Sequence, residues 1–259
     1  DYVSVHGYYV RRTAPYIKCM ARTTRPEADI VRTIKVLEKA GFGGGKVGIA
    51  FDEWNLRCWY HPGLGKFRRN DKVDYEARRE NDMASTYTMA DALFTACFLN
   101  TCLRHCDIVK MANFSPVVNT RGAIFVHEKG ILKRTTYHVF KMYTNLLEPN
   151  VAPVEVKCGD IVNGKDSAPL IDAVLTVSDD DSRRVLAVVN KSPDKSVDFD
   201  ISALTSGASL KATVLDGDSP DAYNDIGAEN RVVPHPATLA VTDGKVTLAP
   251  HSLHFITLR

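Results

Sequence analysis

The sequence lacks any uninterrupted apolar run long enough to cross a bilayer, so we expect no membrane-spanning segment. It also lacks a strong excess of either charge. The formal net charge is +2, which gives no indication of binding to nucleic acid or to an anionic membrane. No signal peptide is visible, but the chain opens on Asp1 in a strand-like run, and we expect the native N-terminus to lie upstream. The compartment is not determined by the sequence, and we favour a cytoplasmic over a secreted location.

Close pairs of cysteines with the spacing of metal ligands are absent too. Cys97, Cys102 and Cys106 fall in one predicted helix, where a disulfide between any two of them is geometrically poor. His105 lies beside them, but the spacing is not that of common zinc sites. We therefore expect free, buried thiols instead of a metal site, and no cofactor. The remaining cysteines are Cys19, Cys58 and Cys158.

The composition is that of a soluble globular protein with one large domain or two smaller ones: 259 residues, 44% hydrophobic and 25% charged. The segment that organises the chain is KVGIAFDEWNLRCWY at 46–60. A short apolar run follows a glycine cluster there and ends in Asp52, Glu53, Trp54 and Asn55. This pattern predicts a buried parallel strand whose C-terminal end presents two carboxylates, an indole and an amide. Strand ends of this kind usually hold the catalytic groups of α/β barrels, although many strands simply turn polar where they end.

Residues 1–149 are predicted to alternate strands and helices. The first strand, a helix that stops at Gly41 and the central strand form one parallel strand–helix–strand unit. The long polar segment 61–85 is expected to form either a rim over the strand ends or a surface loop. The predicted elements are strands at 1–9, 46–51 and 107–112, and helices at 25–40, 87–105 and 134–147.

Residues 150–259 have a different texture. Short alternating or β-branched runs are separated by turn signals such as Asp243-Gly244, which predicts an antiparallel sandwich. The three parallel strands before residue 150 are too few to close a barrel. We therefore expect either a small open sheet or the C-terminal piece of a larger protein. The predicted sandwich strands are 173–177, 185–189, 197–201, 210–215, 239–241, 245–248 and 253–258.

Several of these segments resemble α-L-arabinofuranosidases of glycoside hydrolase family 51. DYVSVHGYY at 1–9 resembles the sixth barrel strand of that family, and IAFDEWN at 49–55 with WYH at 59–61 resembles the seventh. The resemblance implies the C-terminal part of a (β/α)8 TIM barrel over residues 1–149, about strands six to eight, followed by a jelly-roll-like β-sandwich over 150–259. The other matching segments are 92–113 and 117–122 for the eighth strand, 132–140 for the last barrel helix and 246–258 for the closing sandwich strands.

The resemblance also implies a retaining glycosidase that releases terminal α-L-arabinofuranosyl groups from arabinan or arabinoxylan. In such enzymes one carboxylate bonds to the anomeric carbon, while a second carboxyl group about 5 Å away protonates the leaving oxygen and later activates water. Glu53 matches the nucleophile. The acid/base of the family is a Glu in an Asn-Glu pair on the fourth strand, and no such segment occurs here. Asp52 is expected to point to the opposite face of its strand, which makes it a poor substitute.

The acid/base is therefore expected from a complementary N-terminal polypeptide that carries barrel strands one to five. The family suggests an oligomer and no metal required for the chemistry. Among the substrate-binding candidates, His6 and Tyr8 match residues that approach the sugar, and Tyr8 could help to keep the nucleophile ionised. Trp54 and Asn55 match residues that support the nucleophile, and Trp59 matches a residue on the aglycone side.

Two departures from the family pattern affect the site. Arg57-Cys58 forms a short insertion before WYH, which alters the placement of Trp59. Pro116 stands where several members have a sugar-binding Gln, so we expect Asn119 or Arg121 to take over that contact. Two other functions stay open: another barrel glycosidase, such as an endoglucanase or β-xylosidase, and a non-catalytic carbohydrate-binding fragment.

Overall fold

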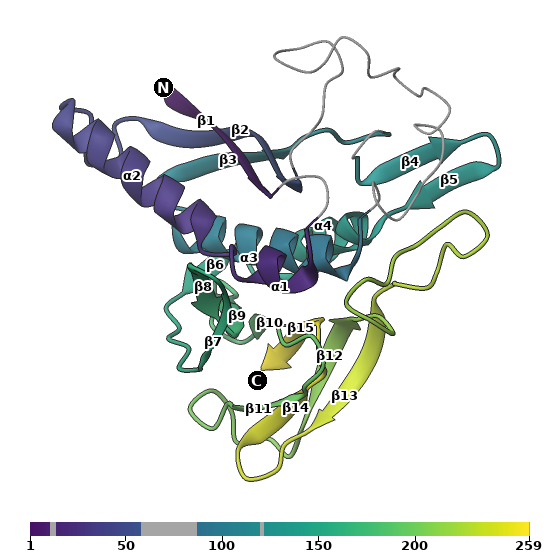
Figure 1. Ribbon diagram of the computed structural model, residues 1–259. Coiled ribbons are helices and arrows are strands. Elements are labelled where there is room, and N and C mark those ends of the chain that lie inside the picture. Colours follow the sequence, from purple (N-terminus) through teal and green to yellow (C-terminus); the bar gives the residue numbers. More distant parts are fainter. Residues whose placement is uncertain (11–13, 58–86, 120–121, 259) are drawn as a thin grey trace.

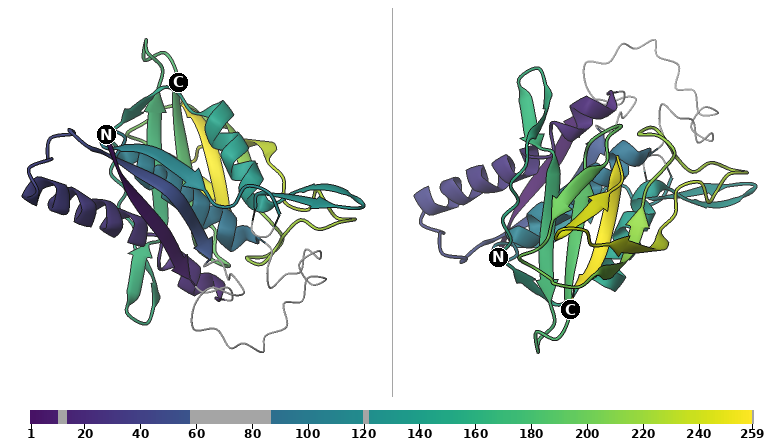
Figure 2. Two further views of the ribbon diagram at one scale, coloured as in Figure 1. Left: turned by 90° about the horizontal axis from the view of Figure 1, so that it is seen from above. Right: turned by 90° about the horizontal axis from the view of Figure 1, so that it is seen from below.

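The computed structural model describes residues 1–10, 14–57, 87–119 and 122–258. The protein has three layers (Figure 1): a small parallel sheet, a layer of helices and a β-sandwich. The parallel sheet has the order β1-β2-β3, and Figure 2 shows its strands side by side across the helices. Its strands are β1 (Tyr2–Val10), β2 (Gly48–Arg57) and β3 (Val109–Phe114), and the helices are α1 (Tyr16–Met20), α2 (Arg25–Lys39), α3 (Met89–Arg104) and α4 (Thr135–Leu146).

Helix α2 begins and ends where its sequence predicts. Pro26 lies in the first turn, where its missing N–H costs no hydrogen bond, and Glu27 favours the positive end of the helix dipole. Gly41 adopts φ +82°, and the amides of Gly41 and Phe42 bond back to the carbonyls of Glu38 and Leu37. This pair of bonds is a Schellman motif, which needs a left-handed residue at the position of Gly41.

Helix α3 forms the centre of the molecule. Its N-terminus is closed by a capping box between Thr88 and Asp91. All its residues are buried except Leu99, Leu103 and Arg104. It contacts β2 and β3 on one side and the sandwich strands β9, β10 and β15 on the other, so both parts of the chain share one core.

The sandwich contains a six-stranded sheet in the order β13-β12-β15-β10-β9-β6. Alternate residues divide between its two faces: Val174 and Val185 join the core around α3, whereas Leu175 and Leu186 face the pair β11–β14. The sheet strands are β6 (Asn150–Ala152), β9 (Ile171–Val177), β10 (Arg184–Asn190), β12 (Ser209–Leu215), β13 (His235–Ala240) and β15 (Ser252–Leu258); the pair is β11 (Val197–Asp200) and β14 (Lys245–Leu248).

Three expectations from the sequence need correction. Strand β2 does not end at Asp52 but continues to Arg57. Two hairpins were not predicted: β4 (Ile124–His127) with β5 (Gly130–Lys133), and β7 (Asp160–Asn163) with β8 (Asp166–Pro169). Not every described thiol is buried, since Cys106 and Cys158 are free but exposed.

The predicted rim at 61–85 and Cys58 lie outside the described residues. None of the described helices has the length and apolar character needed to span a membrane. The division at 149/150 stays a prediction; at that point the chain passes from α4 into β6, the first strand to join the large sheet.

Candidate active site

A β-bulge in β2 shapes the candidate site. Ser4 and His6 are two positions apart in β1, whereas their partners in β2, Ala50 and Glu53, are three positions apart. Strand β3 shows the same mismatch opposite Phe51 and Trp54. One extra residue in β2 therefore interrupts the strict alternation of side chains, as bulges beside functional sites often do.

The bulge brings two consecutive carboxylates to the sheet face that points away from the helices. Phe51 and Trp54 remain on the helix side, where both contact Phe98 of α3. Asp52 and Glu53 both contact side chains of β1 on the opposite face. The expectation that Asp52 points away from Glu53 is therefore wrong, because it assumed regular alternation through this position.

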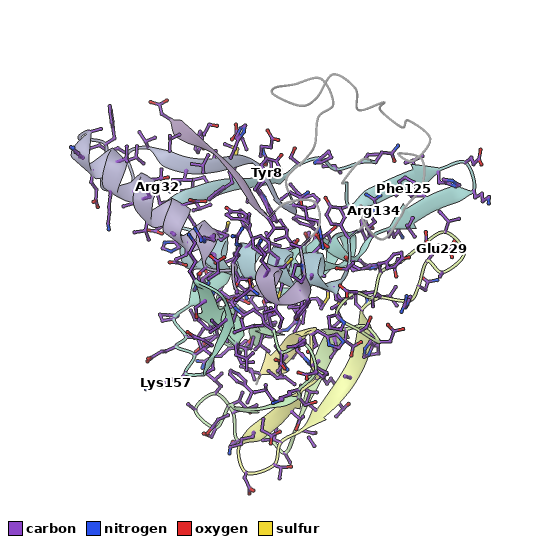
Figure 3. The ribbon with its side chains drawn as sticks, viewed as in Figure 1. Tyr8, Arg32, Phe125, Arg134, Lys157 and Glu229 are labelled. Carbon is purple, nitrogen blue, oxygen red and sulfur yellow. The ribbon has the colours of Figure 1, made fainter. Side chains whose placement is uncertain are left out.

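The Glu53 carboxylate is held from two sides. The Tyr8 hydroxyl, at the end of β1 (Figure 3), donates a short hydrogen bond to Glu53 Oε1. His6 Nδ1 lies 3.3 Å from Glu53 Oε2. The side chain of Glu53 is 34% exposed, so the carboxylate is anchored yet open to solvent. A fixed and accessible carboxylate of this kind has the geometry required of a nucleophile.

Asp52 lies next to this group and is also held by β1. The Ser4 hydroxyl contacts both carboxylate oxygens of Asp52, at 2.8 and 3.0 Å, and His6 Nε2 lies 3.4 Å from Asp52 Oδ1. The Ser4 hydrogen bond, with a smaller contribution from His6, lowers the pKa of Asp52 below 3.8. An acid that stays ionised at neutral pH has no proton to give to a leaving group.

Trp54 and Asn55, which follow Glu53 in β2, are both buried. The Trp54 indole is completely buried and stacked on Phe98, with ring centroids 3.7 Å apart. Asn55 is also buried, and its amide donates to Tyr87 Oη and, over 3.0 Å, to the Ser115 carbonyl. Trp54 therefore packs on the helix side of the sheet. Asn55 lies two residues after Glu53 and in register with Tyr8, so it is on the face of Glu53, where Tyr87 and Ser115 hold its amide.

The end of β2 is fixed to helix α3 by a buried ion pair. Arg57 donates from Nε and Nη2 to the two carboxylate oxygens of Asp91, at 2.7 and 2.9 Å. Burial alone would lower the pKa of Arg57, but the Asp91 carboxylate more than offsets it and the pKa is raised. Asp91 also accepts the Thr88 amide, so strand end and helix start share one anchor.

A second cation lies beneath the β4–β5 hairpin. The buried Arg134 guanidinium lies 4.8 Å from the Phe125 ring centroid and 5.6 Å from that of Tyr87 (Figure 3), and its Nη1 donates to the Gly122 carbonyl. This stack connects the hairpin to Tyr87, which accepts the amide of Asn55.

The remaining predicted contacts are not brought to Glu53 by any described interaction. Asn119 is exposed, has φ +53°, and uses its side-chain oxygen to accept the Val126 amide over 2.6 Å. The structure therefore gives Asn119 a role in folding its own loop. Trp59 and Arg121 lie outside the described residues. Among the residues that are described, no group of three His, Cys, Asp or Glu side chains could hold a metal ion.

Sequence reasoning did not identify Ser4, and it did not predict that Asp52 lies on the same face of the sheet as Glu53. Ser4 could have been found, because positions 4, 6 and 8 share one face of a strand with His6 and Tyr8. The position of Asp52 beside Glu53 could not be found in this way, because the bulge that places both acids on one face is defined by the pairing of β2 with β1 and β3.

Comparison with known proteins identifies the family. The family model for the α-L-arabinofuranosidase C-terminal domain matches residues 52–252. The chain is 24% identical to the intracellular exo-α-(1→5)-L-arabinofuranosidase 1 of Bacillus subtilis, covering 91% of this chain and 47% of that protein. It is 27% identical to the corresponding enzyme of Streptomyces lividans, over 100% of this chain and 39% of that protein.

Solved structures agree with this result. The crystal structure of an α-L-arabinofuranosidase from Thermotoga maritima in complex with arabinose matches with a TM-score of 0.78 at 22% identity, covering 99% of this chain and 52% of that one. The family 51 enzyme AbfB of Bifidobacterium longum matches with a TM-score of 0.76 at 24% identity, covering 100% and 53%. The fold is thus the end of a (β/α)8 barrel followed by a β-sandwich, and the chain spans about half the length of the relatives it matches. By the match over residues 52–252, the chain belongs to the α-L-arabinofuranosidase C-terminal domain family.

Proposed function

We propose that this chain is the C-terminal half of a retaining exo-α-L-arabinofuranosidase in which Glu53 is the nucleophile. The observation that supports this most directly is the Glu53 carboxylate, held between Tyr8 and His6 on the parallel strands β1 and β2 and open to solvent. Glu53 attacks the anomeric carbon of a terminal arabinofuranosyl group, and a covalent glycosyl-enzyme forms. Tyr8 and His6 orient the carboxylate before the attack.

The reaction also needs a carboxylic acid on the opposite side of the glycosidic bond. Asp52 is not suited to that role, because its lowered pKa keeps it ionised and it lies on the same strand as the nucleophile. In our proposal the acid/base comes from a complementary N-terminal polypeptide or segment, which also supplies barrel strands one to five. The share of the relatives that the chain covers, 47% and 39%, is consistent with that division.

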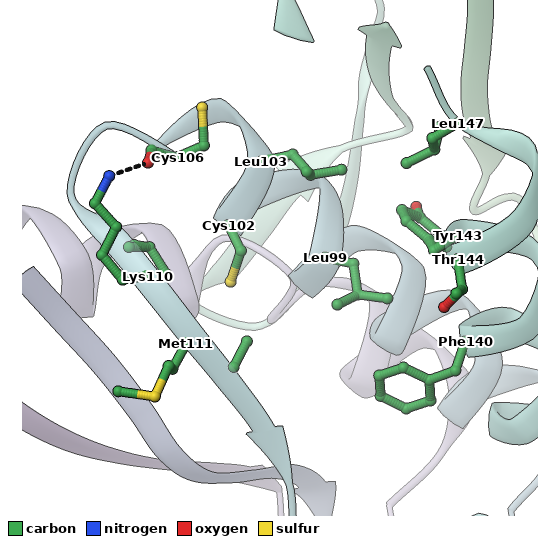
Figure 4. Close-up of a pocket in the computed structure, with 12 residues that line it drawn as sticks. Leu99, Cys102, Leu103, Cys106, Lys110, Met111, Phe140, Tyr143, Thr144 and Leu147 are labelled. Carbon is green, nitrogen blue, oxygen red and sulfur yellow. Dashed lines mark hydrogen bonds between the residues drawn. The ribbon is translucent and has the colours of Figure 1, made fainter. Parts of the chain in front are cut away.

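The edge of β3 supports the same proposal. β3 is the last strand of the parallel sheet, so its outer backbone groups have no strand partner among the described residues. Beside it runs an apolar groove of about 310 Å³ between β3, α3 and α4 (Figure 4). We propose that a parallel strand of the N-terminal part pairs with β3 and places apolar side chains in this groove. Residues lining it include Leu99, Met111, Phe140, Tyr143 and Leu147.

The substrate is proposed from the relatives. The Bacillus subtilis and Streptomyces lividans proteins are named for exo-α-(1→5)-L-arabinofuranosidase activity, and a Bifidobacterium longum relative for the (1→6) activity. We therefore propose terminal arabinofuranosyl groups of arabinan- or arabinoxylan-type saccharides as substrates. The names of several relatives include the word intracellular, so we also propose a location inside the cell and, from the family resemblance, an oligomeric enzyme.

The nucleophile is tested by trapping. The chain, mixed with the N-terminal half of the Bacillus subtilis relative, is treated with a mechanism-based α-L-arabinofuranosyl label and digested for mass spectrometry. We expect the label on Glu53 and no label in Glu53→Gln, with Glu38→Gln, an exposed acid of α2, as the matched control. Label on any other residue, or hydrolysis of an aryl α-L-arabinofuranoside by the 259-residue chain alone at the rate of a complete relative, would contradict the proposal. Aryl β-xylosides and cello-oligosaccharides in the same assay test the other barrel glycosidases, and binding of arabinan without hydrolysis by the mixture would favour a carbohydrate-binding fragment.

A further inference from the structure

Four side chains form a continuous line on the open face of the parallel sheet. Ser4 donates to Asp52, at 2.8 Å from Oδ1 and 3.0 Å from Oδ2. Asp52 Oδ1 lies 3.4 Å from His6 Nε2, and His6 Nδ1 lies 3.3 Å from Glu53 Oε2. The imidazole of His6 therefore lies between two carboxylates, one at each ring nitrogen.

The backbone is deformed in the way that this line requires. In a regular strand Asp52 and Glu53 would occupy opposite faces, so only one of them could lie beside His6. The bulge between Phe51 and Trp54 places both acids on the face of His6. Asp52 has 43% of its side chain exposed and contributes nothing to the apolar core, so core packing does not account for its placement.

We propose that Asp52, anchored by Ser4, is a positioning residue that fixes the His6 imidazole against the Glu53 carboxylate. This inference rests on the proposed role of Glu53 as nucleophile. His6 is 53% exposed, and rotation of its ring about the Cβ–Cγ bond would carry Nδ1 away from Glu53. Contact with Asp52 at Nε2 holds the far side of the ring and so restricts that rotation.

The two acids have different tasks as the reaction proceeds. Each ring nitrogen of His6 faces a carboxylate oxygen, one from Asp52 and one from Glu53. When Glu53 bonds to the sugar, its carboxylate becomes an ester and its negative charge is lost. Asp52 then remains as the anion that holds His6 in place, so the ring is oriented correctly when water releases the sugar and the Glu53 carboxylate forms again.

A spectroscopic experiment on the 259-residue chain tests the contact itself. Ring nitrogen signals of ¹⁵N-histidine-labelled protein are recorded at one pH, and the His6 signals are assigned with His6→Gln. We expect Asp52→Asn to shift the Nε2 signal of His6 and Ser4→Ala to shift it less. The control is Asp198→Asn, because Asp198 is likewise an exposed strand carboxylate that accepts a hydroxyl, from Thr247 over 2.8 Å, but lies in the sandwich. Unchanged His6 signals in Asp52→Asn would overturn the proposal.

Kinetics of the chain mixed with the N-terminal half of the relative test the consequence. We expect Asp52→Asn to lower kcat about tenfold, the effect of losing one hydrogen bond to a charged group, with KM changed less than about twofold. Ser4→Thr keeps the hydroxyl and should retain activity that Ser4→Ala loses. Wild-type kcat in Asp52→Asn would refute the positioning role. Trapping distinguishes the two failures, since label on a residue other than Glu53 rejects the proposed nucleophile whatever the His6 signals show.

Discussion

Breaking the ion pair between Arg57 and Asp91 is expected to destabilise the protein more than breaking any exposed ion pair among the described residues. The two side chains are 8% and 1% exposed, and two hydrogen bonds of 2.7 and 2.9 Å join them. Asp91→Asn keeps the shape of the side chain and can still accept the Thr88 amide, but it removes the counter-charge of a buried guanidinium. Removal of one partner from a buried pair costs about 3–5 kcal/mol.

In a chain of this size each kcal/mol corresponds to about 2–4 °C in Tm, so Asp91→Asn should lower Tm by roughly 6–20 °C. The assay is urea denaturation at pH 7 followed by circular dichroism, with a thermal scan in parallel. The control is Asp181→Asn, because the Asp181–Arg184 pair has a 2.6 Å contact but side chains that are 59% and 40% exposed, and its loss should cost less than about 1 kcal/mol.

The double variant Arg57→Met/Asp91→Asn, which keeps an acceptor for the Thr88 amide, distinguishes an uncompensated charge from lost packing. It removes both charges, so we expect it to be more stable than Asp91→Asn alone. A cost below about 1 kcal/mol for Asp91→Asn would refute the reasoning, as would a double variant less stable than the single one.

Two further predictions concern pH and assembly. The hydrogen bond between Glu27 and His105 raises the pKa of His105 above 6.5 and lowers the pKa of Glu27 below 4.5. The pair therefore stabilises the fold fully between pH 4.5 and 6.5. This stabilisation is lost as pH rises through the pKa of folded His105 and as pH falls through the pKa of folded Glu27. The difference in urea midpoint between wild type and Glu27→Gln should therefore be largest between about pH 4.5 and 6.5, and a difference that does not change with pH would contradict this. Met111 is 39% exposed and lines the β3 groove, so Met111→Lys should leave the fold intact but weaken association with the N-terminal half at least about tenfold in a titration. The control, Val162→Lys on β7, changes a side chain that is 58% exposed and should not weaken association. Equal binding by both variants would reject the groove as the docking surface.

The sequence predicts best those features that depend on neighbouring residues. Pro26 and Gly41 bound α2 as expected, and the apolar run 185–189 forms the predicted strand, β10. Glu53 is predicted to be the nucleophile from a strand end and a family resemblance. The structure adds its contacts with Tyr8 and His6, and the role itself stays a prediction.

The features that were missed depend on residues far apart in the chain. The bulge in β2 follows from its register with β1 and β3, which no local pattern contains, and it reverses the expected direction of Asp52. The pair of Arg57 and Asp91 joins residues 34 positions apart. The structure adds a local role for Asn119, whose side-chain oxygen accepts the Val126 amide, while its contact with the sugar stays a prediction.

The burial of α3 has a consequence for anyone who wishes to truncate the protein. This helix has almost no water-facing stripe, because the strand bearing the proposed nucleophile lies on one flank and β9, β10 and β15 lie on the other. Cutting the chain at residue 150 would remove Asp172 of β9, which accepts hydrogen bonds from Asn100 and Arg104, and would expose that side of α3 to water. The sandwich thus completes the core of the part that bears Glu53. Loss of activity after its deletion would therefore say nothing about sugar recognition by the sandwich.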